Sequence, residues 1–227
     1  MKVTVVALTQ PCVEGIKDAQ ELVSYCARVS NPNNQLHTKT AAGLLKYCIK
    51  HKHFSVFEMA NMVVEIETTR DISRQILRHR SFSFQEFSQR YAEVDPEIIY
   101  RETRMQDLHN RQSSIEVGED SSPNVSFKQA QLEVWNTALT QYNEALLHGV
   151  AKEQARALLP EGLVGTRMYM NGTIRSWITY CMVRCGIETQ KEHRLIAKEI
   201  CKKLIENFPF LAEILTVCLE DNYSAEQ

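Results

Sequence analysis

The sequence lacks the patterns that mark several common protein classes. None of its eight glycines are spaced as GxG and there is no GxxxxGK loop, which excludes a Rossmann dinucleotide turn and a P-loop. A GxSxG nucleophile elbow is also missing. No apolar run approaches 18 residues, and the run at 3–8 is too short for a signal peptide. We therefore expect a soluble protein with no membrane partner.

An excess of either charge is missing as well. The chain carries 26 Lys and Arg against 28 Asp and Glu, which gives a net charge of −2. A nonspecific nucleic-acid binder is normally far more basic. Any positive charge used for binding must therefore be gathered locally, and we expect no nucleic-acid partner.

The seven cysteines are scattered, odd in number and without a CxxC pair. This argues against a disulfide framework and favours a reducing compartment, so the sequence predicts a cytoplasmic protein. His51 and His53 are two residues apart, but no Cys or carboxylate stands at a zinc-binding spacing from them. We therefore expect no metal site.

Hydrophobic periodicity predicts a chain that mixes strands and helices. Apolar and β-branched patterns indicate strands at 2–9, 61–68 and 164–171. Apolar residues three and four apart indicate helices at 15–29, 39–52, 70–80, 126–148, 150–159, 173–185 and 189–207. The segment 113–124 is the most loop-like, and 81–91 is either loop or strand. We expect a single domain over 1–218 and a flexible tail over 219–227.

The longest helix carries an apolar stripe that needs a partner. Leu132, Trp135, Leu139, Tyr142 and Leu146 follow one another at steps of three and four residues. Such a stripe fits a core and fits a subunit interface equally well.

The densest group of reactive side chains is RHRSFSFQEFSQRY at 78–91. One interpretation is structural: cations close a helix at 80, and Phe82, Phe84 and Tyr91 turn inward from a strand. A second is an anion pocket, because arginine donates two parallel hydrogen bonds to phosphate or to a pyrimidine edge. A third is a platform for single-stranded nucleic acid, against which the net charge counts.

The same segment resembles the signature of the flavin-dependent thymidylate synthases, in which RHR is followed by spaced Ser, Glu, Ser and Arg-Tyr. Gln85 departs from it, since Asn is common there. Five further matches stand in the family's order along the chain: ARVS at 27–30, HKHFSVFE at 51–58, Arg74-Gln75, EQARALLP at 153–160, and Arg175-Ser176 with Val183-Arg184. The resemblance covers nearly the whole chain, and the wording FQEFSQRY is most like viral members.

The resemblance implies a fold and a reaction. The fold would be α/β of the α+β type, a mainly antiparallel sheet flanked by long helices, as in the thymidylate synthase-complementing proteins. The enzyme would convert dUMP to dTMP with methylenetetrahydrofolate as the one-carbon donor and NADPH as the reductant, through FAD and without a cysteine nucleophile. It would be a homotetramer with active sites shared between subunits, in the host cytoplasm if viral.

The resemblance also assigns residues to these ligands. Arg184 would be catalytic by facing the uracil edge, where a fixed cation stabilises the ionised base, and His53 would lie near flavin and folate. Contacts to dUMP are implied for Gln75, Arg78, Glu86, Ser88, Gln89, Arg90, Arg156 and Arg184. Contacts to FAD are implied for Ser30, Ser55, Arg78, His79, Arg80, Glu86, Thr173, Arg175 and Thr179. Gln75 with Arg78, and Arg175 with Thr179, would each share a helix face.

Besides Gln85, three further positions depart from the family. Thr173 and Thr179 stand where Asn is frequent, and Glu188 stands where the family has His. They leave open two alternatives: a nucleotide- or RNA-binding regulatory module that has lost catalysis, and a flavin-binding protein without activity. Salt-sensitive binding of single strands without flavin would favour the first of these.

Overall fold

The computed structural model describes residues 1–111 and 113–225. The chain forms two compact units. The first unit comprises Met1, Glu67–Arg78 and Gln85–Met168, and the second comprises Lys2–Ile66, His79–Phe84 and Tyr169–Gln227.

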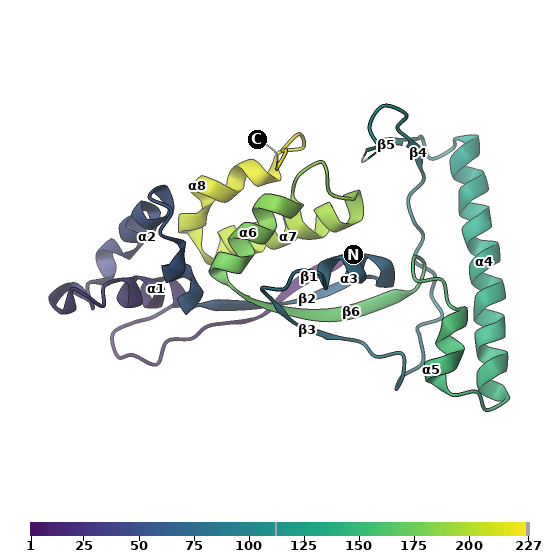
Figure 1. The fold of residues 1–227 in the computed structure, drawn as a ribbon, viewed down its shortest axis with the longest axis horizontal. Coiled ribbons are helices and arrows are strands. Elements are labelled where there is room, and N and C mark those ends of the chain that lie inside the picture. The colour runs from purple at the N-terminus through teal and green to yellow at the C-terminus, as the bar shows by residue number, and fades with distance from the viewer. Residues whose placement is uncertain (112, 226–227) are drawn as a thin grey trace. The chain divides into compact units, whose positions relative to one another are not determined.

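The main sheet has four strands in the order β1–β2–β6–β3 (Figure 1). These are β1 (Lys2–Leu8), β2 (Asn61–Thr69), β6 (Gly165–Thr173) and β3 (Ser83–Glu86). Along β2, Met62, Val64 and Ile66 are fully buried, because alternate side chains of a strand point to opposite faces. The three predicted strands are confirmed, and 81–91 contains a strand.

A small second sheet occupies part of the predicted loop at 113–124. Strand β4 (Arg104–Gln106) pairs antiparallel with β5 (Ser114–Glu116), and Met105 lies opposite Ile115. Helix α4 (Ser122–Leu147) then begins earlier than the apolar stripe indicates, because Pro123 lies in its first turn, where proline is favoured. The loop prediction therefore holds only for the residues between these two elements.

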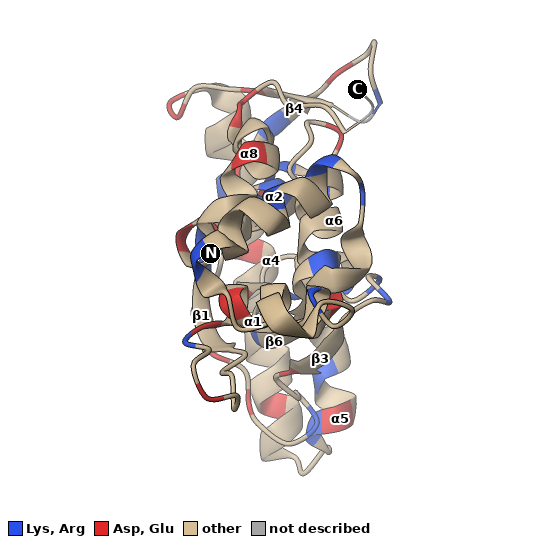
Figure 2. Cartoon of the chain, turned by 90° about the vertical axis from the view of Figure 1, so that its left-hand side faces the viewer, with Lys and Arg blue, Asp and Glu red and all other residues tan. Residues whose placement is uncertain are grey.

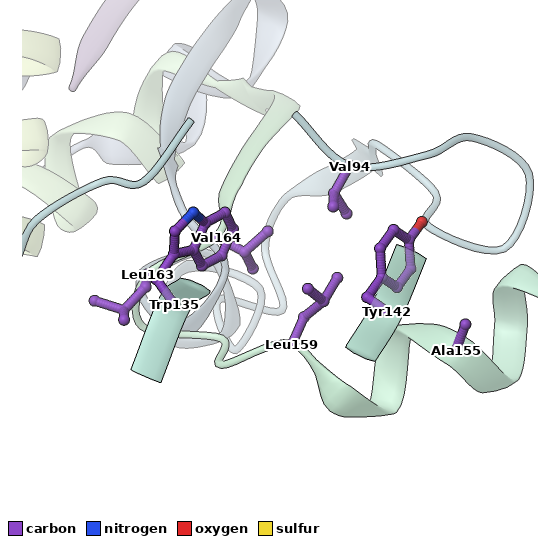
Figure 3. Close-up of a cluster of buried hydrophobic side chains, with 7 residues drawn as sticks. All are labelled: Val94, Trp135, Tyr142, Ala155, Leu159, Leu163 and Val164. Carbon is purple, nitrogen blue, oxygen red and sulfur yellow. The ribbon is translucent and has the colours of Figure 1, made fainter. Parts of the chain in front are cut away.

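The first unit also holds α3 (Arg70–Ile76), α5 (Lys152–Ala155) and the 3-10 segment η4 (Arg156–Leu158). Its core forms around α4, whose Trp135 and Tyr142 are buried (Figure 3). They belong to a cluster that also contains Val94, Ala155, Leu159, Leu163 and Val164. Trp135 Nε1 donates to the Pro96 carbonyl at 3.2 Å, which satisfies the one polar atom of the indole. The predicted stripe is thus at least partly core.

The second unit is mostly helical. Its α-helices are α1 (Ala19–Ala27), α2 (Ala41–Lys50), α6 (Ile174–Arg184), α7 (Lys191–Asn207) and α8 (Ala212–Leu215). Its 3-10 segments are η1 (Pro32–Asn34), η2 (Thr38–Thr40), η3 (Phe54–Met59), η5 (Pro209–Leu211) and η6 (Thr216–Leu219). Helix α6 packs against α7 and η3. It is fixed to β2 by Trp177, whose Nε1 donates to the Met62 carbonyl at 3.0 Å.

Gly172 allows the signature segment to approach β6 closely. A Cβ atom at this position would lie 2.3 Å from a ring carbon of Phe82. The Phe82 ring packs against Trp177 with centroids 4.5 Å apart, so it has little room to retreat. Phe82 is therefore half-buried against the core residue Trp177, which is the inward orientation that the structural interpretation expects. Tyr91, in contrast, is 75% exposed.

Two helix predictions extend too far. The helix predicted at 15–29 begins only at Ala19, because the Asp18 side chain accepts from the Glu21 amide and caps it. The helix predicted at 70–80 ends at Ile76, and the Arg78 amide turns back to the Gln75 carbonyl. Arg78 therefore lies beyond α3, and the prediction that Gln75 and Arg78 share a helix face is wrong.

Residues predicted as a tail make specific contacts. Tyr223 donates through its hydroxyl to the Met182 carbonyl at 2.7 Å, and Ser224 donates to Glu188. Residues 226–227 lie outside the described residues, and tail flexibility stays a prediction. Figure 2 shows Lys and Arg interspersed with Asp and Glu along the ribbon. Within the described chain, no helix has both the length and the apolarity to cross a bilayer.

Candidate active site

In the first unit, Glu86 is held firmly by its neighbours. Its Oε1 accepts from Ser73 Oγ at 2.7 Å and from Thr166 Oγ1 at 3.0 Å. The guanidinium of Arg70 lies 3.6 Å from the same oxygen, and the side chains of both partners are at most 13% exposed. Charge and hydrogen bonds together therefore fix the end of β3 that carries Glu86. Whether Glu86 also touches a nucleotide stays a prediction.

In the same unit, Arg90 and Arg156, both predicted to contact dUMP, bond to one residue, Glu153. Arg90 Nε pairs with Glu153 Oε2 at 3.3 Å, and Arg156 Nε donates to the Glu153 carbonyl at 3.2 Å. Arg90 comes from the signature and Arg156 from the later E-x-A-R match. Each arginine uses Nε in these bonds, which leaves its two amino groups to bind an anion.

Gln89 and Ser88 lie between Glu86 and these arginines. Gln89 is 3% exposed, and its Nε2 is a buried donor with no hydrogen-bond partner among the described residues. A buried amide without a partner is costly, so this atom is suited to receive an acceptor. Ser88 Oγ accepts from the Arg90 amide at 3.4 Å, and its contact with dUMP stays a prediction.

In the second unit, the signature and the end of α6 form one pair. Arg184 Nε donates to His79 Nε2 at 2.9 Å, although the two residues are 105 positions apart in the sequence. His79 must be neutral to accept this bond, with its proton on Nδ1. Ser176 Oγ also donates to the Ser81 carbonyl at 3.2 Å and ties α6 to the signature a second time.

Burial keeps His79 and its neighbour His193 neutral. Desolvation, and then the charge of Arg184, lower the pKa of His79 to about 4. Desolvation, followed by the charges of Arg184 and His79, lowers the pKa of His193 to about 3. His193 Nε2 lies 3.0 Å from the hydroxyl of Tyr180, and the Tyr180 ring packs edge-on against His79 at 5.0 Å. Arg184 therefore bonds to His79, which packs with Tyr180 and His193 in a group of rings that carries no charge.

The start of α6 carries the residues predicted for FAD. Thr173 caps the helix, because its Oγ1 accepts from the Ser176 amide at 3.2 Å. Arg175 forms an ion pair with Glu58, the last residue of the HKHFSVFE match. Thr179 Oγ1 donates to the Arg175 carbonyl at 3.2 Å, so the two residues lie one turn apart, as predicted. Asparagine is also a strong N-cap, so the Thr173 departure keeps the cap.

A specific helix ending presents His53. The amide of His53 donates to the Cys48 carbonyl and the amide of Lys52 to the Ile49 carbonyl, which is the Schellman pattern after α2. Lys52 has a φ of 58°, in the left-handed region that favours glycine. His53 itself is exposed, and its ring centroid lies 6.1 Å from that of His51.

The remaining predicted cofactor residues lie at the surface of their units. Arg78, Arg80, Ser30 and Ser55 are exposed. Ser30 follows α1 in a loop that Arg28 holds in place by donating to the Asn34 and His37 carbonyls and to Thr40. Glu188, where the family has His, accepts instead from Ser224 and the Ala225 amide.

A cavity of about 450 Å³ lies in the first unit. Its lining includes Glu67, Thr68, Glu97 and Arg167 but none of the residues assigned to dUMP or FAD. The predicted residues of this chain therefore do not enclose that cavity.

Sequence reasoning missed several supporting residues. Arg70, Tyr180 and His193 hold Glu86 or His79 in place but belong to no recognised motif. A buried polar residue on a predicted core face is the available signal for Tyr180 and His193, and it does not by itself identify a partner.

Comparison with known proteins places the chain in a family. The model of the thymidylate synthase complementing protein family matches residues 12–210. The chain is 48% identical over 216 residues to a probable flavin-dependent thymidylate synthase of Paramecium bursaria Chlorella virus 1, covering 95% of this chain and 99% of that one. It is also 48% identical over 218 residues to a flavin-dependent thymidylate synthase of Synechocystis, again covering 95% and 99%.

A solved structure shares the fold. The crystal structure of the UMP/dUMP methylase PolB from Streptomyces cacaoi, bound with 5-Br dUMP, matches with a TM-score of 0.79 and 22% identity over 95% of this chain and 94% of that one. The mixed fold of helices and antiparallel sheet predicted from the sequence is confirmed. This chain belongs to the thymidylate synthase complementing protein family.

Proposed function

We propose that the protein is a flavin-dependent thymidylate synthase, which converts dUMP to dTMP with methylenetetrahydrofolate as the one-carbon donor and NADPH as the reductant. The observation that carries the proposal is the bond from Arg184 to His79. It joins the signature to the one arginine assigned to the uracil ring. Relatives at 48% identity over almost the full chain support the same activity.

Arg184 activates the base electrostatically. His79 takes the Nε–H of Arg184, so the plane of the guanidinium is fixed while both amino groups are left for the uracil edge. A preorganised cation there stabilises negative charge on the ring and makes C5 nucleophilic. Because His79 and His193 are neutral, they do not repel the Arg184 guanidinium from its position beside the uracil ring.

The cysteines support chemistry without a thiol nucleophile. Five of the seven, including Cys48 and Cys181, are buried. Burial raises the pKa of both thiols, which disfavours the reactive thiolate. Hydrogen bonds with Cys181 and Cys185 lower the pKa of Cys201 to about 4, but this residue is 0% exposed, so its sulfur is out of reach of a substrate. Ring activation by Arg184 is therefore the route that this chain supports.

Arg90 and Arg156 bind the phosphate of dUMP. Both arginines bond to Glu153, which holds two guanidinium groups in place for one dianion. Because their side chains are already ordered, they lose less conformational entropy on binding than a lone surface arginine would. The unpartnered Nε2 of Gln89 donates to the same nucleotide, and Gln75, Arg78 and Ser88 complete the set.

The second unit has a donor set that fits FAD. Exposed Arg80 and Arg175 supply positive charge for a pyrophosphate, and Ser30, Ser55 and Thr179 supply hydroxyls. Thr173 holds the first turn of α6 in place through its cap. His79 touches the cofactor through its ring, and His53, exposed after α2, meets flavin and folate. When bound, FAD carries reducing equivalents from NADPH to the transferred carbon.

We further propose a homotetramer that shares its active sites and that takes no nucleic acid. Helix α4 supports the assembly, because Val125, Phe127 and Val134 remain 58%, 44% and 53% exposed.

The first experiment is an absorbance spectrum of the purified protein, repeated after addition of FAD and then dUMP. Flavin bands that shift with dUMP would support both binding functions, and formation of dTMP from labelled methylenetetrahydrofolate would then test turnover. Flavin binding without dUMP-dependent reoxidation would point to an inactive relative. Folded protein that retains no flavin and ignores dUMP would overturn the proposal.

A further inference from the structure

Three buried cysteines lie close together, two at the end of α6 that carries Arg184 and one on α7. Cys181 lies in the last turn of α6, Cys185 follows as its C-cap, and Cys201 lies in the middle of α7. All three are 0% exposed, and their sulfur atoms lie within 4.8 Å of one another. Among the described residues, no other group of three His, Cys, Asp or Glu meets the same condition.

Helix geometry explains why the three sulfurs meet. Residues four apart share one face of a helix, so Cys181 and Cys185 both point toward α7, against which α6 packs. Cys201 approaches them from α7, and its Sγ lies 3.4 Å from the Leu215 carbonyl. Ordinary core packing needs apolar volume but does not require three thiols to face a common point.

The spacing suits a metal ion that prefers sulfur. Zinc–thiolate bonds are about 2.3 Å long, so three thiolates arranged around one ion have sulfurs about 4 Å apart. The observed spacing of at most 4.8 Å can reach this value through small side-chain rotations. An all-sulfur set selects Zn²⁺ or Cu⁺ over hard cations such as Mg²⁺ or Ca²⁺.

Charge near the cluster also favours bound thiolates. Lys198 and Lys202 lie one turn or less from Cys201 on α7 and act on it electrostatically. Three thiolates around a divalent ion leave one negative charge, and the two lysines, which also pair with Asp221 and Glu199, add positive charge near it.

We propose that Cys181, Cys185 and Cys201 form a structural site for one thiophilic d10 ion, Zn²⁺ or Cu⁺. Binding forms three metal–sulfur bonds and releases the thiol protons to solvent. The ion clamps the end of α6 to α7. Because Arg184 lies between two of the ligands in the sequence, the clamp also fixes the backbone from which Arg184 reaches His79. The proposal does not depend on the enzymatic activity.

The test uses the full chain, reduced and stripped of metal with a chelator, and titrated anaerobically with Co²⁺ as a probe for zinc. We expect a sulfur-to-cobalt charge-transfer band that saturates at one equivalent and disappears when Zn²⁺ is added. A parallel titration with Cu⁺ against a chromogenic chelator distinguishes the two ions. Saturation by either ion supports the site, and a reduced protein that binds neither overturns it.

Two variants locate the site. Cys201→Ser keeps a hydroxyl for the Leu215 carbonyl but removes a soft ligand, so we expect it to lose the band while its circular dichroism stays unchanged. Cys48→Ala is the matched control, because Cys48 is a buried cysteine of the same unit outside the cluster. Added Zn²⁺ should raise the Tm of the wild type and the control but not of Cys201→Ser. Loss of two titratable thiols without reductant, and no metal binding, would replace the metal site with a disulfide.

Discussion

At the scale of single residues, Arg184 has the most specific prediction. Replacing it with alanine removes the fixed cation at the uracil edge, and removal of one preorganised group typically costs about 10²–10³-fold in kcat. We expect Arg184→Ala to lose at least that much dTMP formation while keeping its fold and its flavin. Steady-state kinetics and circular dichroism measure this.

The matched control is Arg194→Ala in the same unit. Arg194 donates to the Ile187 carbonyl and has no assigned ligand, so its loss should leave kcat within a few-fold of the wild type. Near-normal turnover in folded Arg184→Ala would remove Arg184 from the mechanism.

The two buried histidines predict how stability depends on pH. Their pKa values are about 4 for His79 and about 3 for His193, whereas an unfolded histidine titrates near 6.5. Between these values the unfolded chain binds more protons, so the free energy of unfolding falls as the pH drops from about 7 to about 4. Each pKa unit is worth about 1.4 kcal/mol, so we expect the pair to contribute a loss of several kcal/mol over this range.

Urea unfolding at pH 7, 6 and 5 measures this loss. His193→Gln keeps a hydrogen-bonding group for Tyr180 but cannot be protonated, so its stability should fall less steeply with acid. An equal slope in the variant and the wild type would show that His193 does not titrate as the structure requires.

At the scale of elements, Lys52 has a left-handed backbone conformation, which is unfavourable for a residue with a side chain. A left-handed residue costs roughly 1–2 kcal/mol unless it is glycine, yet the Schellman ending of α2 requires it at this position. Lys52→Gly should therefore raise the free energy of unfolding by up to about 1 kcal/mol. Thermal melting measures the gain, with Lys50→Gly, inside α2, as a control that should destabilise.

Helix α6 tests whether Thr173 serves as a cap, as a ligand, or as both. Thr173→Ala removes the acceptor for the Ser176 amide and should cost about 1 kcal/mol, whereas Thr173→Asn should cost little. Urea unfolding measures the cap, and a flavin titration of the same variants measures the ligand role. If Thr173→Ala is as stable as the wild type, the cap does not contribute as described.

The elements also show what sequence can and cannot predict. Strands β2 and β6 and helices α4, α6 and α7 were predictable, because long periodic runs of apolar residues report burial directly. The true end of α3 was not, because it depends on the turn by which Arg78 reaches back to Gln75. Short elements such as β4 and α8 carry too few residues for a periodicity.

For the site, too, local patterns were predictable and long-range contacts were not. The motifs identified Arg184 and His79 as members of one family pattern, but periodicity could not show that they form a bond across 105 positions. Nor could it show that Glu153 joins Arg90 to Arg156. Long-range pairs are set by tertiary packing, which is not encoded in any one segment.

At the scale of the whole molecule, strands β2, β3 and β6 each contribute residues to both units. The single domain expected over 1–218 stays a prediction.

The proposed assembly gives a prediction at this scale. We expect sedimentation equilibrium to report four copies of the 26.1 kDa chain. Val134→Glu places a charge on the exposed apolar side of α4 and should weaken the tetramer, because an unpaired charge is costly to bury. Asn136→Glu, on another face of the same helix, should not. A wild-type monomer at micromolar concentration would contradict the tetramer.

Helix α6 sets a limit on how the gene can change. Arg175 and Arg184 are separated by nine residues, which is about 13.5 Å and two and a half turns of helix. Inserting one codon between them would swing Arg184 by about 100° around the axis and away from His79. Substitutions inside α6 can be absorbed one at a time, but a change of its length cannot, so insertions and deletions should be absent from this helix while they accumulate in the segment 107–121.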